Sequence, residues 1–105
     1  MGFVKVCDLS QLEEDEIFRG EPEGGPVIAL YRLGDEVFAT HDICTHGEAS
    51  LSEDGFIEGN VVVCSWHDGG FDIRTGEACR LPCLDPIGTY PIEVRDGEVF
   101  VDLDG

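Results

Sequence analysis

Two short pairs of cysteine and histidine constrain this sequence more than any other feature. The first pair lies in Cys44-Thr45-His46, and the second lies in Cys64-Ser65-Trp66-His67. Even in a fully extended chain, residues two positions apart lie within about 7 Å of each other. Both side chains of one pair can therefore reach the same small metal centre. Together the two pairs offer two thiolates and two imidazoles, which are typical ligands of transition metals.

Two kinds of metal site fit this ligand set. One is a single tetrahedral zinc ion with two cysteine and two histidine ligands. The other is a [2Fe–2S] cluster with two cysteines on one iron and two histidines on the other. The interleaved order of the pairs favours the cluster, because zinc fingers more often place both cysteines before both histidines. A third interpretation, ordinary core cysteines and loop histidines, is disfavoured because all four residues fall in two tight pairs beside glycines.

The total of five cysteines argues against a secreted disulfide framework, which usually has an even number. Cys7 lies in a segment typical of a strand, and we expect it to be part of the core. Cys79 and Cys83 have no further cysteine or histidine beside them. We therefore expect these two to be spare thiols without a role in the site. His41 lies three residues before Cys44, and at the end of a predicted strand it is expected to be structural.

Turn signals predict an antiparallel β fold. Val27–Leu33 and Val37–Thr40 are separated by Gly34-Asp35-Glu36, which indicates a hairpin. Asp96-Gly97 is a strong hairpin signal, and it lies between the strand-like segments 90–95 and 99–103. We therefore predict an all-β chain that folds as an antiparallel β-sandwich or barrel.

The rest of the chain is expected to be less regular. Phe3–Cys7 has the composition of a strand, and Ser10 with Glu13 has the spacing of a capping box, which predicts one helical turn over 10–15. Gly59-Asn60 predicts a turn before the strand that contains Val61. We expect one domain over 1–105, with a β scaffold at 1–41 and 87–105. A small loop-rich subdomain at 42–86 is inserted in it.

The charge balance excludes several classes of partner. The chain has 23 acidic and 6 basic residues, a net charge of −17 with neutral histidines. Binding to nucleic acid or to an anionic membrane surface needs clustered lysine and arginine. No apolar run approaches the roughly 20 residues that span a bilayer, and no secretory signal follows Met1. We therefore expect a cytoplasmic protein that binds neither nucleic acid nor membrane, and whose acidic surface can steer it to basic patches on partners.

The two pairs and their surroundings resemble one known family. Cys44-Thr45-His46-Gly47 and Cys64-Ser65-Trp66-His67 are similar to the two ligand boxes of Rieske-type ferredoxins. The segments 51–59, 70–78 and 89–92 resemble the corresponding parts of ferredoxins that serve aromatic-ring-hydroxylating dioxygenases, of the kind that act on biphenyl or naphthalene. The resemblance extends over nearly the whole chain.

This resemblance implies a β-sandwich with a small cluster-binding subdomain and one [2Fe–2S] cluster per chain. The implied cluster ligands are Cys44, His46, Cys64 and His67. The implied function is that of a one-electron carrier, which is not itself an enzyme. It would pass electrons from a flavin-containing, NADH-dependent ferredoxin reductase to the terminal oxygenase. Since such docking is transient, we expect a monomer.

Departures from the high-potential Rieske proteins imply a low reduction potential. Those proteins have an extra cysteine in each box, where this chain has Glu48 or Ala49 and Trp66. They also place serine and tyrosine hydroxyls near the cluster, where this chain has Gly69 and Phe71. Hydrogen bonds to the sulfurs raise the potential, so their loss lowers it. The resemblance further implies that Trp66 and Asp68 belong to the surroundings of the cluster, and that a loop with Pro82 covers it. Alternatively, Trp66 only packs the loop, Asp68 points to solvent, and Pro82 only turns the chain.

Two other functions are compatible with the residues. One is a zinc-stabilised interaction module without a redox role. The other is a Rieske small subunit of a different oxidoreductase, such as an assimilatory nitrite reductase. The metal content and the colour of the protein distinguish the zinc module from an iron–sulfur carrier.

Overall fold

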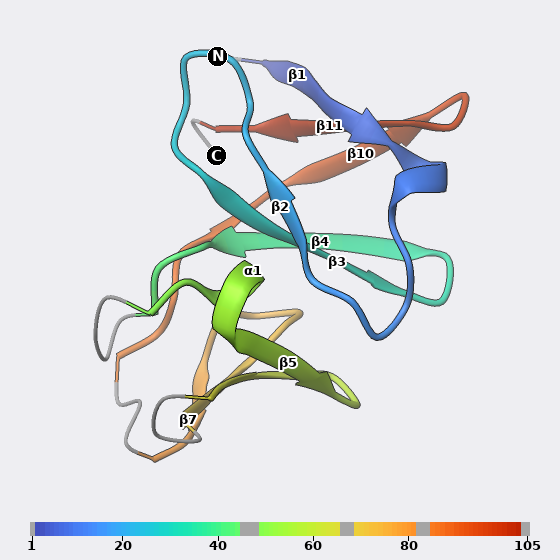
Figure 1. Ribbon diagram of the computed structural model, residues 1–105. Coiled ribbons are helices and arrows are strands. Elements are labelled where there is room, and N and C mark those ends of the chain that lie inside the picture. Colours follow the sequence, from blue (N-terminus) through green and yellow to red (C-terminus); the bar gives the residue numbers. More distant parts are fainter. Residues whose placement is uncertain (1, 45–48, 66–68, 82–84, 104–105) are drawn as a thin grey trace.

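The computed structural model describes residues 2–44, 49–65, 69–81 and 85–103. Its strands form three antiparallel sheets, which Figure 1 shows as three successive layers. The upper sheet contains β1 (Phe3–Asp8), β11 (Glu98–Asp102) and β10 (Ile92–Arg95), in that order. The middle sheet contains β2 (Phe18–Gly20), β3 (Ile28–Leu33), β4 (Glu36–His41) and β9 (Thr89–Tyr90). The lower sheet contains β5 (Gly55–Glu58), β6 (Val61–Cys64), β7 (Gly69–Asp72) and β8 (Ala78–Arg80). The prediction of an all-β antiparallel fold is confirmed.

The expected hairpins are present because their turns contain residues that tolerate positive φ angles. Asp96 and Gly97 have φ angles of 50° and 77°, as a type I′ turn requires, and they connect β10 to β11. Gly34 has a φ of 65° in the turn from β3 to β4. Gly59 has a φ of 61° in the turn that leads into β6. Local turn chemistry therefore sets the pairing of neighbouring strands.

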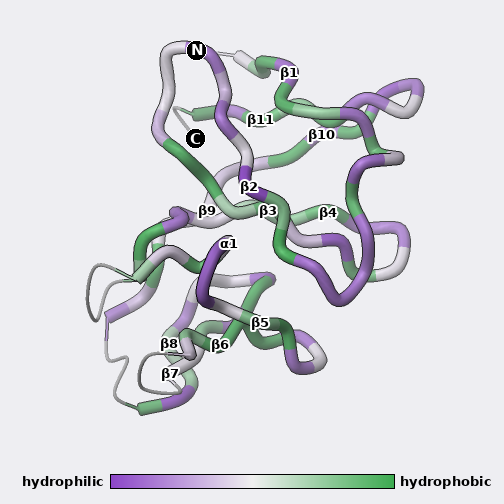
Figure 2. The backbone as a smooth tube through the Cα atoms, viewed as in Figure 1, coloured by the Kyte–Doolittle hydropathy of each residue, from purple (hydrophilic) through white to green (hydrophobic). Residues whose placement is uncertain are grey.

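Strand β3 connects the two hydrophobic cores because both of its faces are buried. Ile28 and Leu30 point into the upper core, and Ala29 and Tyr31, which alternate with them, point into the lower core. The upper core also contains Cys7, Leu12, Val37, Ala39, Val99 and Val101. The lower core also contains Cys44, Ala49, Leu51, Val62, Cys64, Phe71, Ile73 and Ile87. Figure 2 shows hydrophobic residues along the strands. In contrast, residues 13–16, which precede β2, are hydrophilic.

Two parts of the described chain differ from the sequence-based expectation. The helical turn predicted over 10–15 is a shorter 3-10 helix, η1 (Leu9–Gln11). Gln11 reaches back so that its Oε1 accepts a hydrogen bond from the Asp8 backbone at 2.9 Å, which replaces the predicted pairing of Ser10 with Glu13. The region 42–86, expected to be rich in loops, contains the whole lower sheet and a short helix, α1 (Leu51–Asp54). Pairing between strands makes this region more regular than its glycines suggest.

The helices of the described ranges are short. The longest, α1, has four residues. No helix in this part of the chain is long and apolar enough to cross a membrane.

Candidate metal centre

The structure places the two predicted cysteine ligands in one hydrophobic cluster. The side chains of Cys44 and Cys64 belong to residues that are only 2% and 3% exposed. Both pack in the lower core, together with Leu51 and Phe71. The remaining predicted site residues with side chains, His46, Trp66, His67, Asp68 and Pro82, lie outside the described residues. The fold therefore places Cys44 and Cys64, which are 20 positions apart in the sequence, in the same buried cluster.

The backbone of each cysteine is paired with a residue that follows it by five positions. The Cys44 N–H donates to the carbonyl of Ala49 at 2.9 Å, and Ile43 forms a β-bridge with Ser50. Cys64 is the last residue of β6 and lies opposite Gly69, the first residue of β7. The backbone is therefore paired on both sides of residues 45–48 and of residues 65–68. These are the segments that contain the two histidines of the Cys–His pairs.

Helix α1 is bonded to the backbone next to both cysteines. At its beginning, the Leu51 N–H donates to the Asp42 carbonyl at 2.7 Å. At its end, the Asp54 carbonyl accepts hydrogen bonds from the N–H of Ser65 at 3.2 Å and from the Ser65 hydroxyl. Leu51 is fully buried and fixes the helix to the lower core. One short helix thus connects the chain before Cys44 to the chain after Cys64.

Asp42 is a buried carboxylate that the sequence analysis did not identify. The residue is 2% exposed. Its carboxylate accepts a hydrogen bond from the Ser50 hydroxyl at 2.5 Å and one from the Ser52 N–H at 2.9 Å. An Arg19 guanidinium nitrogen lies 3.6 Å from the same carboxylate. Nothing in the local sequence distinguishes this aspartate from the other acidic residues.

Gly69 and Phe71 lie on β7 close to the two cysteines, since Gly69 pairs with Cys64 and Phe71 belongs to the same buried cluster. Gly69 is buried, and Phe71 is fully buried within the cluster that contains both cysteines. Neither residue has a hydroxyl group. Side chains at these two positions therefore cannot donate a hydrogen bond to a sulfur atom.

Three other described residues that the sequence singled out, Cys7, Cys79 and His41, lie on β1, β8 and β4. Cys7 lies on β1 in the upper core, as predicted, and burial raises the pKa of its thiol to about 11. Cys79 is exposed on β8, while Cys83 lies outside the described residues. The ring of His41 packs edge-on against Tyr90, with ring centroids 5.2 Å apart, and hydrogen-bonds to the Tyr90 hydroxyl at 3.2 Å.

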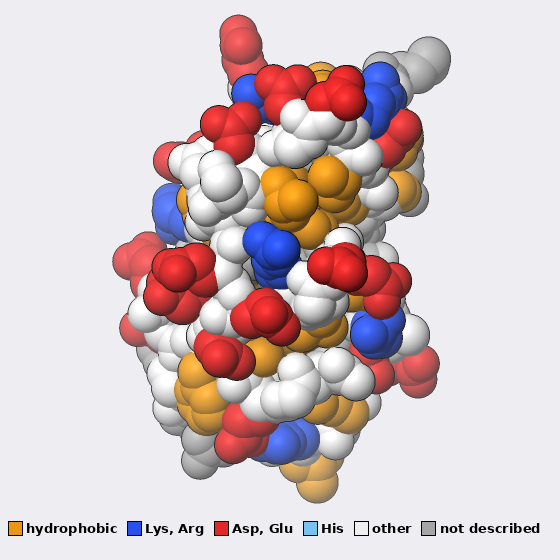
Figure 3. Space-filling model, turned by 90° about the vertical axis from the view of Figure 1, so that its right-hand side faces the viewer, with side chains coloured by type: hydrophobic (Ala, Val, Ile, Leu, Met, Phe, Trp, Pro, Cys, Tyr) orange, Lys and Arg blue, Asp and Glu red, His pale blue; other side chains and the backbone are white. Residues whose placement is uncertain are grey.

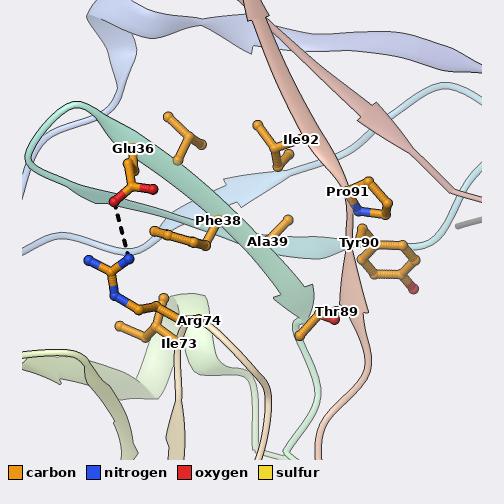
Figure 4. Close-up of a pocket in the computed structure, with 10 residues that line it drawn as sticks. Glu36, Phe38, Ala39, Ile73, Arg74, Thr89, Tyr90, Pro91 and Ile92 are labelled. Carbon is orange, nitrogen blue, oxygen red and sulfur yellow. Dashed lines mark hydrogen bonds and ion pairs between the residues drawn. The ribbon is translucent and has the colours of Figure 1, made fainter.

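Arg74 connects the lower sheet to the middle sheet beside a surface pocket (Figure 4). Its guanidinium donates to a Glu36 carboxylate oxygen at 3.1 Å and lies 5.1 Å from the centre of the Phe38 ring. Both partners are on β4, whereas Arg74 follows β7. This contact helps to fix the sheet that carries Cys64 relative to the sheet that precedes Cys44.

The donor set suits a metal that binds sulfur. Both thiols belong to buried residues, and in the sequence each is followed within three residues by a histidine. Among the described residues, no three or more cysteine, histidine, aspartate or glutamate side chains are grouped so that they could hold a metal ion. The two cysteines are half of either ligand set considered above, the single zinc ion or the iron–sulfur cluster.

Comparisons with known proteins distinguish these two possibilities. The family described as Rieske [2Fe-2S] domain matches residues 2–91. The ferredoxin component of a p-cumate 2,3-dioxygenase system from Pseudomonas putida is 50% identical over 100 residues, which cover 95% of this chain and 85% of that protein.

Solved structures agree with this match. A ferredoxin of Sphingomonas yanoikuyae B1 is 38% identical and superposes with a TM-score of 0.90, covering 96% of this chain and 98% of the other. A chain from a complex of reduced oxygenase and oxidized ferredoxin in carbazole 1,9a-dioxygenase is 43% identical, with a TM-score of 0.86. That match covers 94% of this chain and 91% of the other.

Proposed function

Because this chain belongs to the Rieske [2Fe–2S] domain family, we propose that it is the ferredoxin component of an aromatic-ring dioxygenase system. Proteins of this kind transfer electrons and are not the catalytic components of their systems. The observation that carries the proposal is the 50% identity to the p-cumate system ferredoxin over nearly the whole chain. The family implies one [2Fe–2S] cluster per chain, which takes up and releases a single electron.

We propose that Cys44 and Cys64 hold one iron and that His46 and His67 hold the other. The two buried thiols support the first half of this assignment, because low exposure protects thiolate ligands from water. The positions of the histidines in the two boxes support the second half. We assign Trp66, Asp68, Gly69 and Pro82 to the surroundings of the cluster. In the same proposal, residues 42–86 form the cluster-binding subdomain within a scaffold of 1–41 and 87–105.

The proposed partners are a flavin-containing ferredoxin reductase and the terminal oxygenase. The carbazole relative, whose structure is a complex with its oxygenase, supports the second partner. The proposed protein is a cytoplasmic monomer that meets each partner in turn. A carrier of this kind needs a transient interface rather than a pocket for the aromatic compound.

A low reduction potential is the expected result of voltammetry on the purified protein. Rieske potentials range from about −150 to +300 mV, and we expect a value at the lower end. Gly69 and Phe71 supply no hydroxyl to stabilise the additional negative charge of the reduced state. A midpoint well above 0 mV would contradict this expectation.

Electron transfer from the reductase and electron transfer to the oxygenase are both expected to slow as salt is added. Five of the six basic side chains pair with carboxylates, namely Lys5, Arg19, Arg74, Arg80 and Arg95. Acidic side chains therefore dominate the charged part of the surface, as one face shows in Figure 3. Steered association is fast at low ionic strength, and we expect rates to fall about tenfold between about 20 mM and about 500 mM salt. Rates that do not change with salt would contradict steering but not electron transfer.

The proposed function is tested with the components of a dioxygenase system. The purified protein is mixed in a stopped-flow instrument with NADH and a catalytic amount of the reductase, and then with the oxidised oxygenase. We expect the visible absorption to bleach in the first step and to return in the second. Failure of a cluster-loaded protein to be reduced or reoxidised by any such pair of components would contradict the proposal.

A further inference from the structure

We propose that Asp42 is a positioning residue of the metal centre, and that its buried carboxylate fixes the Cys44 segment to α1. This inference rests on the proposed metal centre, because it concerns how the chain holds the cysteines in place. Asp42 lies two residues before Cys44 in the sequence. It acts on the site through the chain that it anchors.

The contacts of Asp42 join the chain before residues 45–48 to the chain after them. Its carboxylate oxygens accept hydrogen bonds from the Ser50 hydroxyl and the Ser52 N–H, and its carbonyl accepts one from the Leu51 N–H. All three donors follow residues 45–48, whereas Asp42 precedes them. Together with the bond between Cys44 and Ala49, these contacts hold residues 42–44 against residues 49–52.

The same constraint continues to the other cysteine. Ser50 precedes α1 and Ser52 lies within it, so the carboxylate fixes the beginning of the helix. The other end of the helix is bonded to Ser65, the neighbour of Cys64, through the Asp54 carbonyl. Since α1 has only four residues, a shift at its beginning is carried to its end. The relative placement of the two cysteine segments therefore depends on Asp42.

The charge of Asp42 is compensated within the network. Its side chain is 1% exposed, and the partly exposed Arg19 lies 3.6 Å away, on β2. Arg19 also pairs with Glu53 of α1 at 3.3 Å. A buried carboxylate is tolerated only when it is paired and hydrogen-bonded. Burial of this carboxylate requires three polar partners, and a loop held by all three keeps a fixed position.

The test compares Asp42→Ala, Asp42→Asn and a destabilised control, Val99→Ala, in the cluster-loaded protein. Val99 is fully buried in the upper core, away from both cysteines. The readouts are the rate at which visible absorption is lost in the presence of an iron chelator, the EPR spectrum of the reduced protein, and the denaturant midpoint of unfolding. Measurements are made at denaturant concentrations where the variants are equally far below their midpoints.

We expect Asp42→Ala to lose its cluster at least about tenfold faster than Val99→Ala, in line with the effect of removing groups that orient metal ligands. Its EPR lines should broaden, because the cysteine segments adopt a range of positions. Asp42→Asn should lie close to the parent protein, since an amide can accept from the Ser52 N–H and donate to the Ser50 hydroxyl. Equal rates for Asp42→Ala and Val99→Ala would overturn the inference, as would equal rates for Asp42→Asn and Asp42→Ala.

A second readout keeps the test independent of the cluster. Amide hydrogen exchange of the metal-free protein should show faster exchange at Leu51 and Ser52 in Asp42→Ala than in Val99→Ala. Unchanged protection at these amides would contradict the proposed anchor. If the parent protein itself takes up no iron–sulfur cluster, the proposed function fails. If the parent is loaded and Asp42→Ala behaves like the control, only this inference fails.

Discussion

Cys64→Ala protein is expected to be purified without the visible absorption of an iron–sulfur cluster, whereas Cys79→Ala protein keeps the full absorption. Cys64 is a proposed iron ligand, and an alanine methyl group has no metal-binding atom. Cys64 is 3% exposed at the end of β6. Cys79 is exposed on β8 and serves as a matched control for the loss of a thiol.

The comparison is made on iron and acid-labile sulfide per chain, with the visible spectrum. We expect both contents in Cys64→Ala to fall to the background of the assay and those in Cys79→Ala to equal the parent. Circular dichroism of each variant shows whether the β fold persists. A folded Cys64→Ala protein that retains two irons and two sulfides would contradict the ligand assignment.

Gly55→Ala is expected to lower the free energy of unfolding by about 3 kcal/mol, the upper part of the range for overpacked sites. Gly55 has an ordinary φ of −94°, so its importance does not come from backbone conformation. A Cβ atom at this position would lie 2.6 Å from the carbonyl oxygen of Leu51 and 3.1 Å from that of Val63. Backbone atoms cannot move aside as a flexible side chain can. The substitution must therefore displace α1 from β6.

Gly59→Ala is the matched control for this prediction. Gly59 lies at the other end of β5, where a Cβ atom would meet nothing within 4 Å, but its φ is +61°. The expected cost is about 1 kcal/mol, because an alanine in this conformation is only mildly strained. Denaturant unfolding measures both. Gly55 also pairs with Cys64, so Gly55→Ala should lose its cluster sooner than Gly59→Ala. Equal stabilities of the two variants would contradict the packing argument.

The parts of the fold that sequence predicted are those in which local chemistry decides. Asp96-Gly97 specifies a type I′ turn on its own, and the hairpin at Gly34 is similar. In contrast, β5 begins with Gly55 and follows three polar residues, which give no strand signal. Its strand structure comes from pairing with β6. Helix α1 is too short to have a periodic pattern and is held by its bonds to Asp42 and Ser65.

In the candidate site, the cysteine and histidine pairs were predictable from the sequence, whereas the residues that hold them in place were not. Cysteine and histidine are uncommon in this chain, so their spacing near Cys44 and Cys64 is informative. Asp42 is one of 23 acidic residues, and only its burial in the folded chain distinguishes it. The contact of Arg74 with β4 likewise joins residues 38 positions apart, which no local pattern connects.

The most direct test of the proposed cluster is the absorption spectrum of the purified protein before and after dithionite, followed by low-temperature EPR of the reduced sample. We expect a brown protein with broad visible bands that bleach on reduction. We also expect an EPR spectrum of the kind given by a cluster with histidine ligands on one iron. A colourless protein that contains one zinc ion and gains no colour on anaerobic treatment with iron and sulfide would contradict the proposed cluster.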